Sequence, residues 1–236
     1  MTVNPKPAHV LPPIIETTVP VLGGGVFPVR RVYCVGRNYL AHIREMKEGD
    51  ERDPPFFFQK PRDAIIPDAS TIPYPPLTSN YQFEGELVVA IGATGRSIPT
   101  ELALDHIYGY ACGLDMTRRD RQFDARDMRL PWEVGKSFDD SAPCGVITPA
   151  SAGHRTSGPL VLTVNGAECQ RGDLSQMIWS PPEIVAQLSR QVTLQPGDLI
   201  MTGTPAGVGP VEPGDQIVLH IEGLVPLQIS IGAALA

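Results

Sequence analysis

Residues 81–91, YQFEGELVVAI, carry the clearest secondary-structure signal in the chain. The run is rich in aromatic and aliphatic residues and ends at Gly92, so it is predicted to be one strand. Alternate side chains of a strand share a face, which would place the carboxylates of Glu84 and Glu86 together. Such a pair is unfavourable unless water surrounds it or a cation lies between the two groups. From the residues alone, a solvated strand face and a cation site remain equally open.

Short strands are expected on both sides of this run. The chain has 236 residues, and its 25 prolines and 23 glycines are spread along it, a pattern typical of many short strands separated by turns. Asn165-Gly166 is a strong hairpin signal, and two Pro-Gly-Asp turns precede the apolar runs LIMTG and QIVLHI. The other expected strands cover residues 31–35, 56–60, 144–148, 160–164 and 168–171. Residues 69–76 contain three prolines and should be extended or turning.

A few short helices complete the expected fold. They cover residues 39–47, 100–106, 117–128 and 181–192, the last with Pro-Pro in its first turn. Thr117 with Asp120 gives the third a weak capping box. The fold class is therefore α/β and strand-rich. The length fits one large domain, from residue 28 to 236, and the Pro-rich residues 1–27 are predicted to be an irregular extension.

The composition excludes some classes of protein and favours others. A net charge of −7 gives no basic footprint for nucleic acid, and we expect no membrane span and no signal peptide. The four cysteines are scattered without a CxxC pair, which indicates reduced thiols in a cytoplasmic protein. An acidic protein that binds an acidic substrate must supply local cations.

Asp115 is a candidate third carboxylate beside Glu84 and Glu86. It follows the small, apolar run GYACGL, where a buried strand is expected to end. Its alternative role is to cap the helix that follows. Three carboxylates without a His or Cys cluster favour Mg²⁺, Mn²⁺ or Ca²⁺ over Zn²⁺.

Other polar residues have two possible roles each. His42 and Glu45 lie three residues apart on a predicted helix, where a carboxylate beside an imidazole makes a general base, although a surface pair is the more common arrangement. Lys60 and Lys136 each follow an aromatic or apolar segment and could meet a carboxylate or a developing enolate, although most lysines lie at the surface. Arg37 lies in a glycine-led loop after a strand. Residues 202–209, TGTPAGVG, lack the lysine of a phosphate-binding loop, but their amides and hydroxyls could hold a carboxylate.

Six ordered segments together resemble the fumarylacetoacetate hydrolase family. They read YCVGRNYLAHIREM, PFFFQKPRDAI, YQFEGELVVAIG, GYACGLDMTRRDRQ, WEVGKSFDDSAP and IMTGTPAGVGP. Within that family, FPVRRVYCVGRNY and PPFFFQKP are most similar to the fumarylpyruvate hydrolases of gentisate breakdown. The resemblance implies a mixed, strand-rich β-roll or sandwich that forms a homodimer, with residues 28–236 as its catalytic domain.

The resemblance also implies roles for individual residues. Glu84, Glu86 and Asp115 would hold Mg²⁺ or Mn²⁺, with Ca²⁺ possible. His42 and Glu45 would form a base dyad on a helix that closes over the substrate, and Lys136 would lie beside the metal. The residues expected to bind substrate are Arg37, Lys60, Arg119, Gln122 and Thr204.

The implied reaction is hydrolysis of a carbon–carbon bond in a 2,4-dioxo acid, with fumarylpyruvate giving fumarate and pyruvate. The substrate would be a small dicarboxylic oxo acid, and Arg118, Arg119 and Arg121 are candidates to hold its distal carboxylate. The same site would also suit an oxaloacetate decarboxylase or an acylpyruvate hydrolase. A non-catalytic binding protein on this fold is the alternative outside enzymes.

Overall fold

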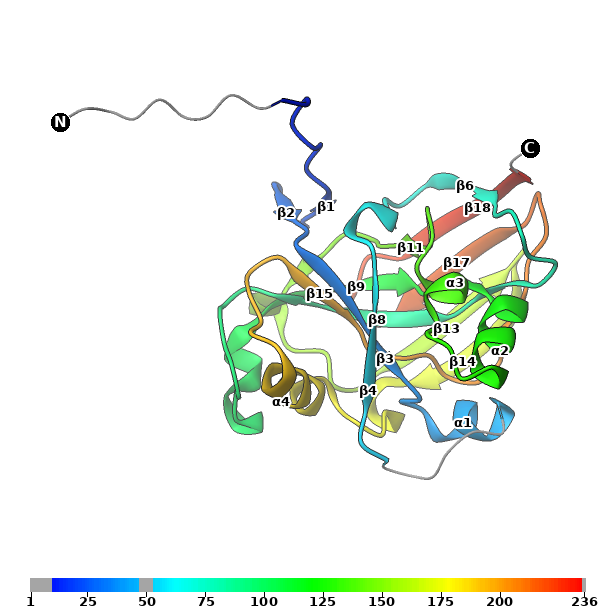
Figure 1. Cartoon of the computed structure of the whole chain (residues 1–236). Helices are drawn as coiled ribbons and strands as arrows, with labels where there is room; N and C mark the ends of the chain where they lie inside the picture. The colour runs from blue at the N-terminus through cyan, green and yellow to red at the C-terminus, as the bar shows by residue number, and fades with distance from the viewer. Residues whose placement is uncertain (1–9, 47–52, 235–236) are drawn as a thin grey trace.

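Two β-sheets pack against each other in the computed structural model, which describes residues 10–46 and 53–234 (Figure 1). The larger sheet has the strand order β12-β9-β8-β15-β3-β4. Its strands are β12 (Thr148–Pro149), β9 (Ile107–Leu114), β8 (Gly85–Ile91), β15 (Asp198–Met201), β3 (Arg31–Gly36) and β4 (Phe56–Lys60). β15 runs parallel to β3, and the other neighbours are antiparallel.

The second sheet has five strands in the order β14-β13-β17-β18-β6. They are β14 (Ala167–Asp173), β13 (Pro159–Val164), β17 (Gln216–Ile221), β18 (Leu227–Ala234) and β6 (Ser70–Tyr74). The main core lies between the sheets, where Leu87 and Val89 join one cluster with Leu162 and Leu219. Gly85 allows this close approach, because a Cβ there would lie 3.0 Å from both of those leucines of the second sheet.

A smaller core covers the other face of the larger sheet. Val88 and Ala90 of β8 face it, together with Cys34 and Met201. The strand pair β1 (Thr18–Pro20) and β2 (Val26–Pro28) supplies buried Val19 and Phe27 to this core. β8 is therefore buried on both faces, which explains why it is an almost continuous apolar run.

Short elements surround the two sheets. The helices are α1 (Leu40–Met46), α2 (Arg119–Asp127), α3 (Glu133–Lys136) and α4 (Pro181–Gln191), and the 3-10 helices are η1 (Arg62–Ala64), η2 (Thr100–His106), η3 (Ala150–Ala152) and η4 (Leu174–Gln176). Two small sheets join β10 (Thr117–Arg118), β7 (Tyr81–Phe83) and β16 (Gly209–Pro210), and β11 (Ala142–Pro143) with β5 (Ile65–Ile66). None of the described helices combines the length and apolar character needed to cross a bilayer.

The strand-rich fold class is confirmed, and so are most of the expected elements. The Asn165-Gly166 turn joins β13 to β14, with both residues at positive φ. The helix expected at residues 39–47 is α1, and Lys47 lies outside the described residues. Residues 69–76 include β6, which is the last strand in the order of its sheet and pairs in parallel with β18, with an irregularity in register beside its proline.

Four predictions about elements were wrong. The run 81–91 is two strands, because the chain leaves the small sheet of β7 at Glu84 and enters the large sheet at Gly85. Thr117 does not cap a helix: it belongs to β10, and α2 begins at Arg119 without a side-chain cap. Residues 144–148 are not one strand, since β11 ends before them and β12 begins at Thr148. The predicted irregular extension also contains β1.

Candidate active site and metal centre

Four neighbouring strands of the larger sheet, β9, β8, β15 and β3, each have one terminus at the same end of the sheet, which we call the site edge. Gly85 at the start of β8 pairs with Leu114 at the end of β9, and Met201 at the end of β15 pairs with Val88. β3 ends beside β15 because the two are parallel. The residues just outside these strands therefore meet at one place, although they are far apart in the sequence.

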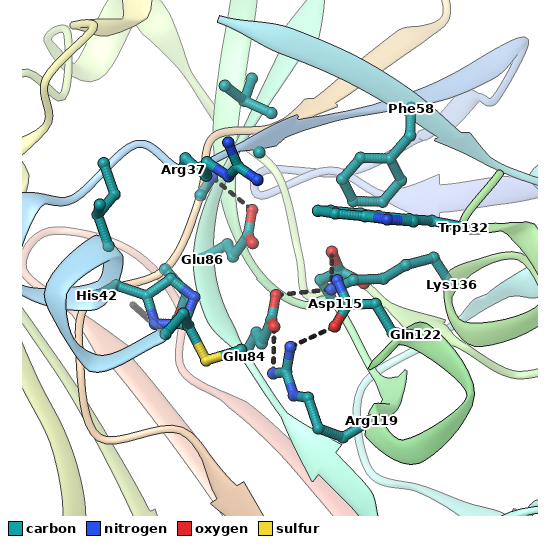
Figure 2. Close-up of a pocket in the computed structure, with 16 residues that line it drawn as sticks. Arg37, His42, Phe58, Glu84, Glu86, Asp115, Arg119, Gln122, Trp132 and Lys136 are labelled. Carbon is teal, nitrogen blue, oxygen red and sulfur yellow. Dashed lines mark hydrogen bonds and ion pairs between the residues drawn. The ribbon is translucent and has the colours of Figure 1, made fainter. Parts of the chain in front are cut away.

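Glu84, Glu86 and Asp115 form an acidic triad at the site edge. Each is at most 5 % exposed, and one carboxylate oxygen from each lies within 4.8 Å of the others. Figure 2 shows the three side chains turned toward a common cavity. The solvated strand face that the sequence left open is therefore wrong, and so is the alternative role of Asp115 as a helix cap, since Asp115 lies before β10 rather than at the start of α2.

Three cations surround the triad on its protein side. Lys136 Nζ donates hydrogen bonds to Glu84 (2.8 Å), Asp115 (2.9 Å) and the Thr117 hydroxyl (2.7 Å). Arg119 donates to Glu84 Oε1 at 2.5 Å. Lys60 Nζ lies 2.8 Å from Asp115 Oδ1. Glu86, by contrast, accepts a hydrogen bond only from the backbone amide of Gly203, at 2.6 Å, among the contacts of the described residues.

This asymmetry separates the pKa values of the two glutamates. Burial by itself raises the pKa of Glu84, but the adjacent Lys136 and Arg119 outweigh it and hold that pKa well below its ordinary value. Burial raises the pKa of Glu86 well above its ordinary value, and the negative charges of Asp115 and Glu84 add to this shift. The site therefore has one carboxylate whose charge needs a further cation.

The residues present fit a hard divalent cation. Within residues 10–46 and 53–234, Glu86 has no cationic partner in direct contact, and Asp115 Oδ1 is buried and accepts no hydrogen bond, although Lys60 is near. A divalent ion would satisfy both atoms and relieve the repulsion within the triad. All the candidate ligand atoms are carboxylate oxygens, which suit Mg²⁺, Mn²⁺ or Ca²⁺.

His42 and Glu45 both belong to α1. His42 lies on the opposite side of the cavity from Lys136 (Figure 2). His42 Nδ1 is 3.0 Å from Glu45 Oε2. A proton on Nδ1 leaves Nε2 free to act as a base. The hydrogen bond from His42 is the main reason that the pKa of Glu45 lies below its ordinary value, and a hydrogen bond from the Gly207 amide contributes to it.

The loop after β15 connects α1 to the strand that carries Glu86. Gly207 donates to Glu45, and Gly203 donates to Glu86. Gly207 has φ +95°, and a Cβ on it would lie 2.2 Å from the backbone oxygen of Cys169, so only glycine fits there. The loop therefore contacts both the dyad and the triad through its backbone amides.

A sequence comparison identifies the wider group of proteins. The profile of the fumarylacetoacetate (FAA) hydrolase C-terminal family matches residues 31–231. The chain belongs to the fumarylacetoacetate hydrolase family.

Individual members of the fumarylacetoacetate hydrolase family are similar over most of the chain. A fumarylpyruvate hydrolase from a Ralstonia species is 44 % identical over 179 residues, covering 76 % of this chain and 93 % of the relative. The human mitochondrial oxaloacetate tautomerase is 41 % identical over 205 residues, covering 86 % of this chain and 91 % of the relative. The crystal structure of the Pseudomonas aeruginosa fumarylpyruvate hydrolase, in complex with Mn²⁺ and pyruvate, superposes with a TM-score of 0.93 at 49 % identity, covering 96 % and 100 % of the two chains.

The other residues expected at this family's site lie at different depths. Arg37, Arg119, Gln122 and Thr204 line the cavity. Lys60 is fully buried behind Asp115, where it also donates to the backbone oxygens of Met116 and Lys136.

Two of the three arginines suggested for a distal carboxylate lie apart from the cavity wall. Arg118 stacks on Phe138 at 4.2 Å, and Arg121 lies 4.0 Å from Asp124 beside a separate groove. Arg119 remains in the wall, where it donates to Glu84, to Gln122 and to Gln82. These bonds use three of the five N–H groups of its guanidinium.

Two important residues escaped the sequence reasoning. Gln170 is fully buried on β14; its side chain accepts from the Gly85 amide at 2.9 Å and donates to the Thr204 hydroxyl and the Pro205 oxygen, each at 2.8 Å. Trp132 lines the cavity opposite Glu86 (Figure 2). Gln170 lies among charged residues in the sequence and carries no local signal, whereas Trp132 lies within one of the family-like segments.

Proposed function

We propose that this protein is a divalent-metal-dependent hydrolase that cleaves the C3–C4 bond of fumarylpyruvate, a 2,4-dioxo acid, to give fumarate and pyruvate. The observation that carries the proposal is a buried acidic triad that faces a His–Glu dyad across a single cavity. The relative crystallised with Mn²⁺ and pyruvate supports the same assignment.

The proposed metal ligands are Glu84, Glu86 and Asp115, and the proposed ion is Mg²⁺ or Mn²⁺. Bound there, the ion would act as a Lewis acid toward the carboxylate end of the oxo acid and would offset negative charge. Arg119, Gln122 and Thr204 would hold that end of the substrate in the cavity. Lys60 would form an ion pair with Asp115 from behind rather than touch the substrate.

His42 is the proposed general base. Its Nε2 would take a proton from a water molecule, whose oxygen then bonds to C4 of the substrate. Glu45 would hold the imidazole in the productive tautomer and stabilise its protonated form. As the C3–C4 bond breaks, its electron pair forms the enolate of pyruvate, and the protonated imidazole returns a proton to C3. Lys136, in the cavity wall, would contribute positive charge near the developing enolate.

Oxaloacetate is the second candidate substrate, because an oxaloacetate tautomerase is 41 % identical to this chain. Decarboxylation of oxaloacetate, or hydrolysis of other acylpyruvates, would bind the oxo acid through the same metal site and cavity residues. Pyruvate release from fumarylpyruvate, acetylpyruvate and oxaloacetate should be measured side by side with Mn²⁺, Mg²⁺ or EDTA. Metal-dependent release of pyruvate and fumarate in equal amounts supports the proposal; pyruvate with carbon dioxide from oxaloacetate alone would overturn it.

A non-catalytic binding protein would behave differently in a second assay. Oxalate mimics the enolate of pyruvate, so a working site should bind it only when Mn²⁺ or Mg²⁺ is present, and calorimetry can measure this. The proposal also includes a homodimer located in the cytoplasm. Light scattering tests the dimer, and cell fractionation tests the location.

A further inference from the structure

The cavity beside the acidic triad is too small for a whole dicarboxylic oxo acid. Its volume is about 40 Å³, which is room for about three water-sized groups. Only the end of a substrate that approaches the triad fits inside. The remaining atoms extend outward from its opening.

A wider groove adjoins the cavity on one side. It has a volume of about 430 Å³ and is lined mainly by aromatic residues of β4 and by Trp132. Arg37, Phe58 and Trp132 line both the cavity and this groove, so they form the boundary between the two. Figure 2 shows Trp132 and Phe58 on one side of the opening and Arg37 on the other.

The aromatic side of this boundary is rigid. Trp132 packs edge-on against Phe56 with ring centroids 5.0 Å apart, and Phe58 lies 6.0 Å from Trp132. Lys136, which holds Glu84 and Asp115, also lies 5.4 Å from the Phe58 ring. The rings are tilted relative to one another, so the flat surface on this side is the indole of Trp132 itself. An indole favours a planar, conjugated chain, because stacking needs a flat partner.

The opposite side of the boundary carries a positive charge. Arg37 follows β3 with φ +61°, and its guanidinium lies 5.4 Å from the centre of the Phe56 ring. That contact places the charge at the boundary between the cavity and the groove. Arg37 lines both spaces, whereas Arg119 lines the cavity alone and Arg118 and Arg121 line neither of the two.

We propose that Arg37, Trp132 and Phe58 form a distal subsite that selects 2,4-dioxo acids whose acyl group is planar, unsaturated and ends in a carboxylate. Trp132 and Phe58 contact the conjugated chain, and Arg37 binds the terminal carboxylate. This assignment rests on the proposed function, since it concerns the end of the substrate remote from the triad.

Arg37→Met tests the charge. We expect kcat/KM for fumarylpyruvate to fall about 10- to 100-fold, as for loss of a hydrogen bond to a charged group. For acetylpyruvate, which has no distal carboxylate, the change should stay within about threefold. Arg37→Lys should recover part of the loss, because lysine keeps the charge but not the planar fork. Arg96→Met is the matched control: Arg96 follows the far end of β8 and contacts Thr193.

Trp132 tests the flat surface. Succinylpyruvate keeps the distal carboxylate but has a saturated chain, so the ratio of kcat/KM for fumarylpyruvate to that for succinylpyruvate reports planarity alone. Trp132→Leu should lower this ratio about fivefold or more, as expected from a loss of about 1 kcal/mol in stacking, and Trp132→Phe should retain most of it. An unchanged ratio in Trp132→Leu would overturn the role of this flat surface.

Other outcomes separate this inference from the proposed function. Equal losses on fumarylpyruvate and acetylpyruvate in Arg37→Met, or no loss on either, would overturn the distal role of Arg37. If the wild-type protein cleaves neither acid, the proposed function is wrong. The distal subsite is then tested by measuring the binding of the two acids. Calorimetry with Mn²⁺ should then still show that Arg37→Met weakens binding of fumarylpyruvate but not of acetylpyruvate, and equal weakening would overturn the subsite.

Discussion

At the scale of single residues, the chemistry depends on charges that the fold buries together. Glu86 is the member of the triad without a cation in direct contact, whereas Glu84 is held by Lys136 and Arg119. His42 lies outside the triad and pairs with Glu45. Metal binding and base catalysis are thus assigned to different side chains, and single substitutions should separate them.

His42→Ala should lower kcat by about 10²- to 10⁴-fold, as expected for loss of a general base. The affinity for Mn²⁺ should remain near that of the wild type, because His42 supplies none of the proposed ligands. Steady-state kinetics and metal titration of the same preparation check both parts. Loss of Mn²⁺ affinity comparable to the loss of rate would show that His42 is a ligand instead.

At the scale of elements, the loop after β15, strand β14 and helix α2 hold the site in place. Gln170 on β14 connects the backbone between the two glutamates to the loop that carries Thr204. Asp120 on α2 holds residues 78–80, which precede β7 and Glu84. These connections explain why residues outside the cavity should affect it.

Gln170→Met keeps the side-chain length but removes the amide, which leaves the Gly85 amide and the Pro205 oxygen without these partners. We expect the free energy of unfolding to fall by about 1–3 kcal/mol, the cost of unsatisfied buried polar groups. Denaturant unfolding measures this. Gln216→Met, on an exposed position of β17 in the same sheet, is the control and should change stability by less than about 0.5 kcal/mol. Equal stability of both variants would contradict the connection.

Asp120 should make stability depend on pH. Burial alone raises the pKa of Asp120, but hydrogen bonds from Thr78 and from the Ser79 and Arg121 amides outweigh it, so its pKa in the folded state is lowered. A lowered pKa stabilises the folded state above the unfolded pKa of about 3.9, and this contribution is lost as the pH falls through the folded value.

This is checked by comparing the free energy of unfolding of the wild type with that of Asp120→Asn at several pH values. The wild type should be the more stable of the two at neutral pH, and the difference should shrink below about pH 4. Unfolding in denaturant at several pH values gives both curves. A difference that is constant from neutral pH to pH 3 would contradict the assignment.

At the scale of the whole molecule, the triad joins β8, β9 and the loops around them, so a bound ion should stabilise the entire fold. Mn²⁺ at 100 times its Kd should add about 2.7 kcal/mol. For a chain of this length that corresponds to a rise in Tm of roughly 5–10 °C. Scanning calorimetry with Mn²⁺ and with EDTA measures the rise. It should be largely lost in Glu86→Gln, and an equal rise in that variant would place the ion elsewhere.

The sequence by itself determined the strand-rich class, most element positions and the residue types that could bind a hard cation. These features depend on local patterns: alternation and apolar runs for β3, β4 and β8, the Asn165-Gly166 turn, and the spacing of His42 and Glu45. The six segments that resemble the family also indicated which of those residues belong to one site. The site residues themselves were predicted by that resemblance more than by local pattern.

Only the tertiary structure decided which polar groups meet. The division of residues 81–91 at Glu84, the position of Lys60 behind Asp115 and the connecting role of Gln170 all depend on contacts between segments that are distant in the sequence. Local propensity does not encode such contacts, because the burial and the charge of a side chain's surroundings come from other strands. For the same reason, the sequence could not show that Arg37 and Trp132 both lie at the boundary between the cavity and the groove. Their positions depend on how β3, β4 and α3 pack together.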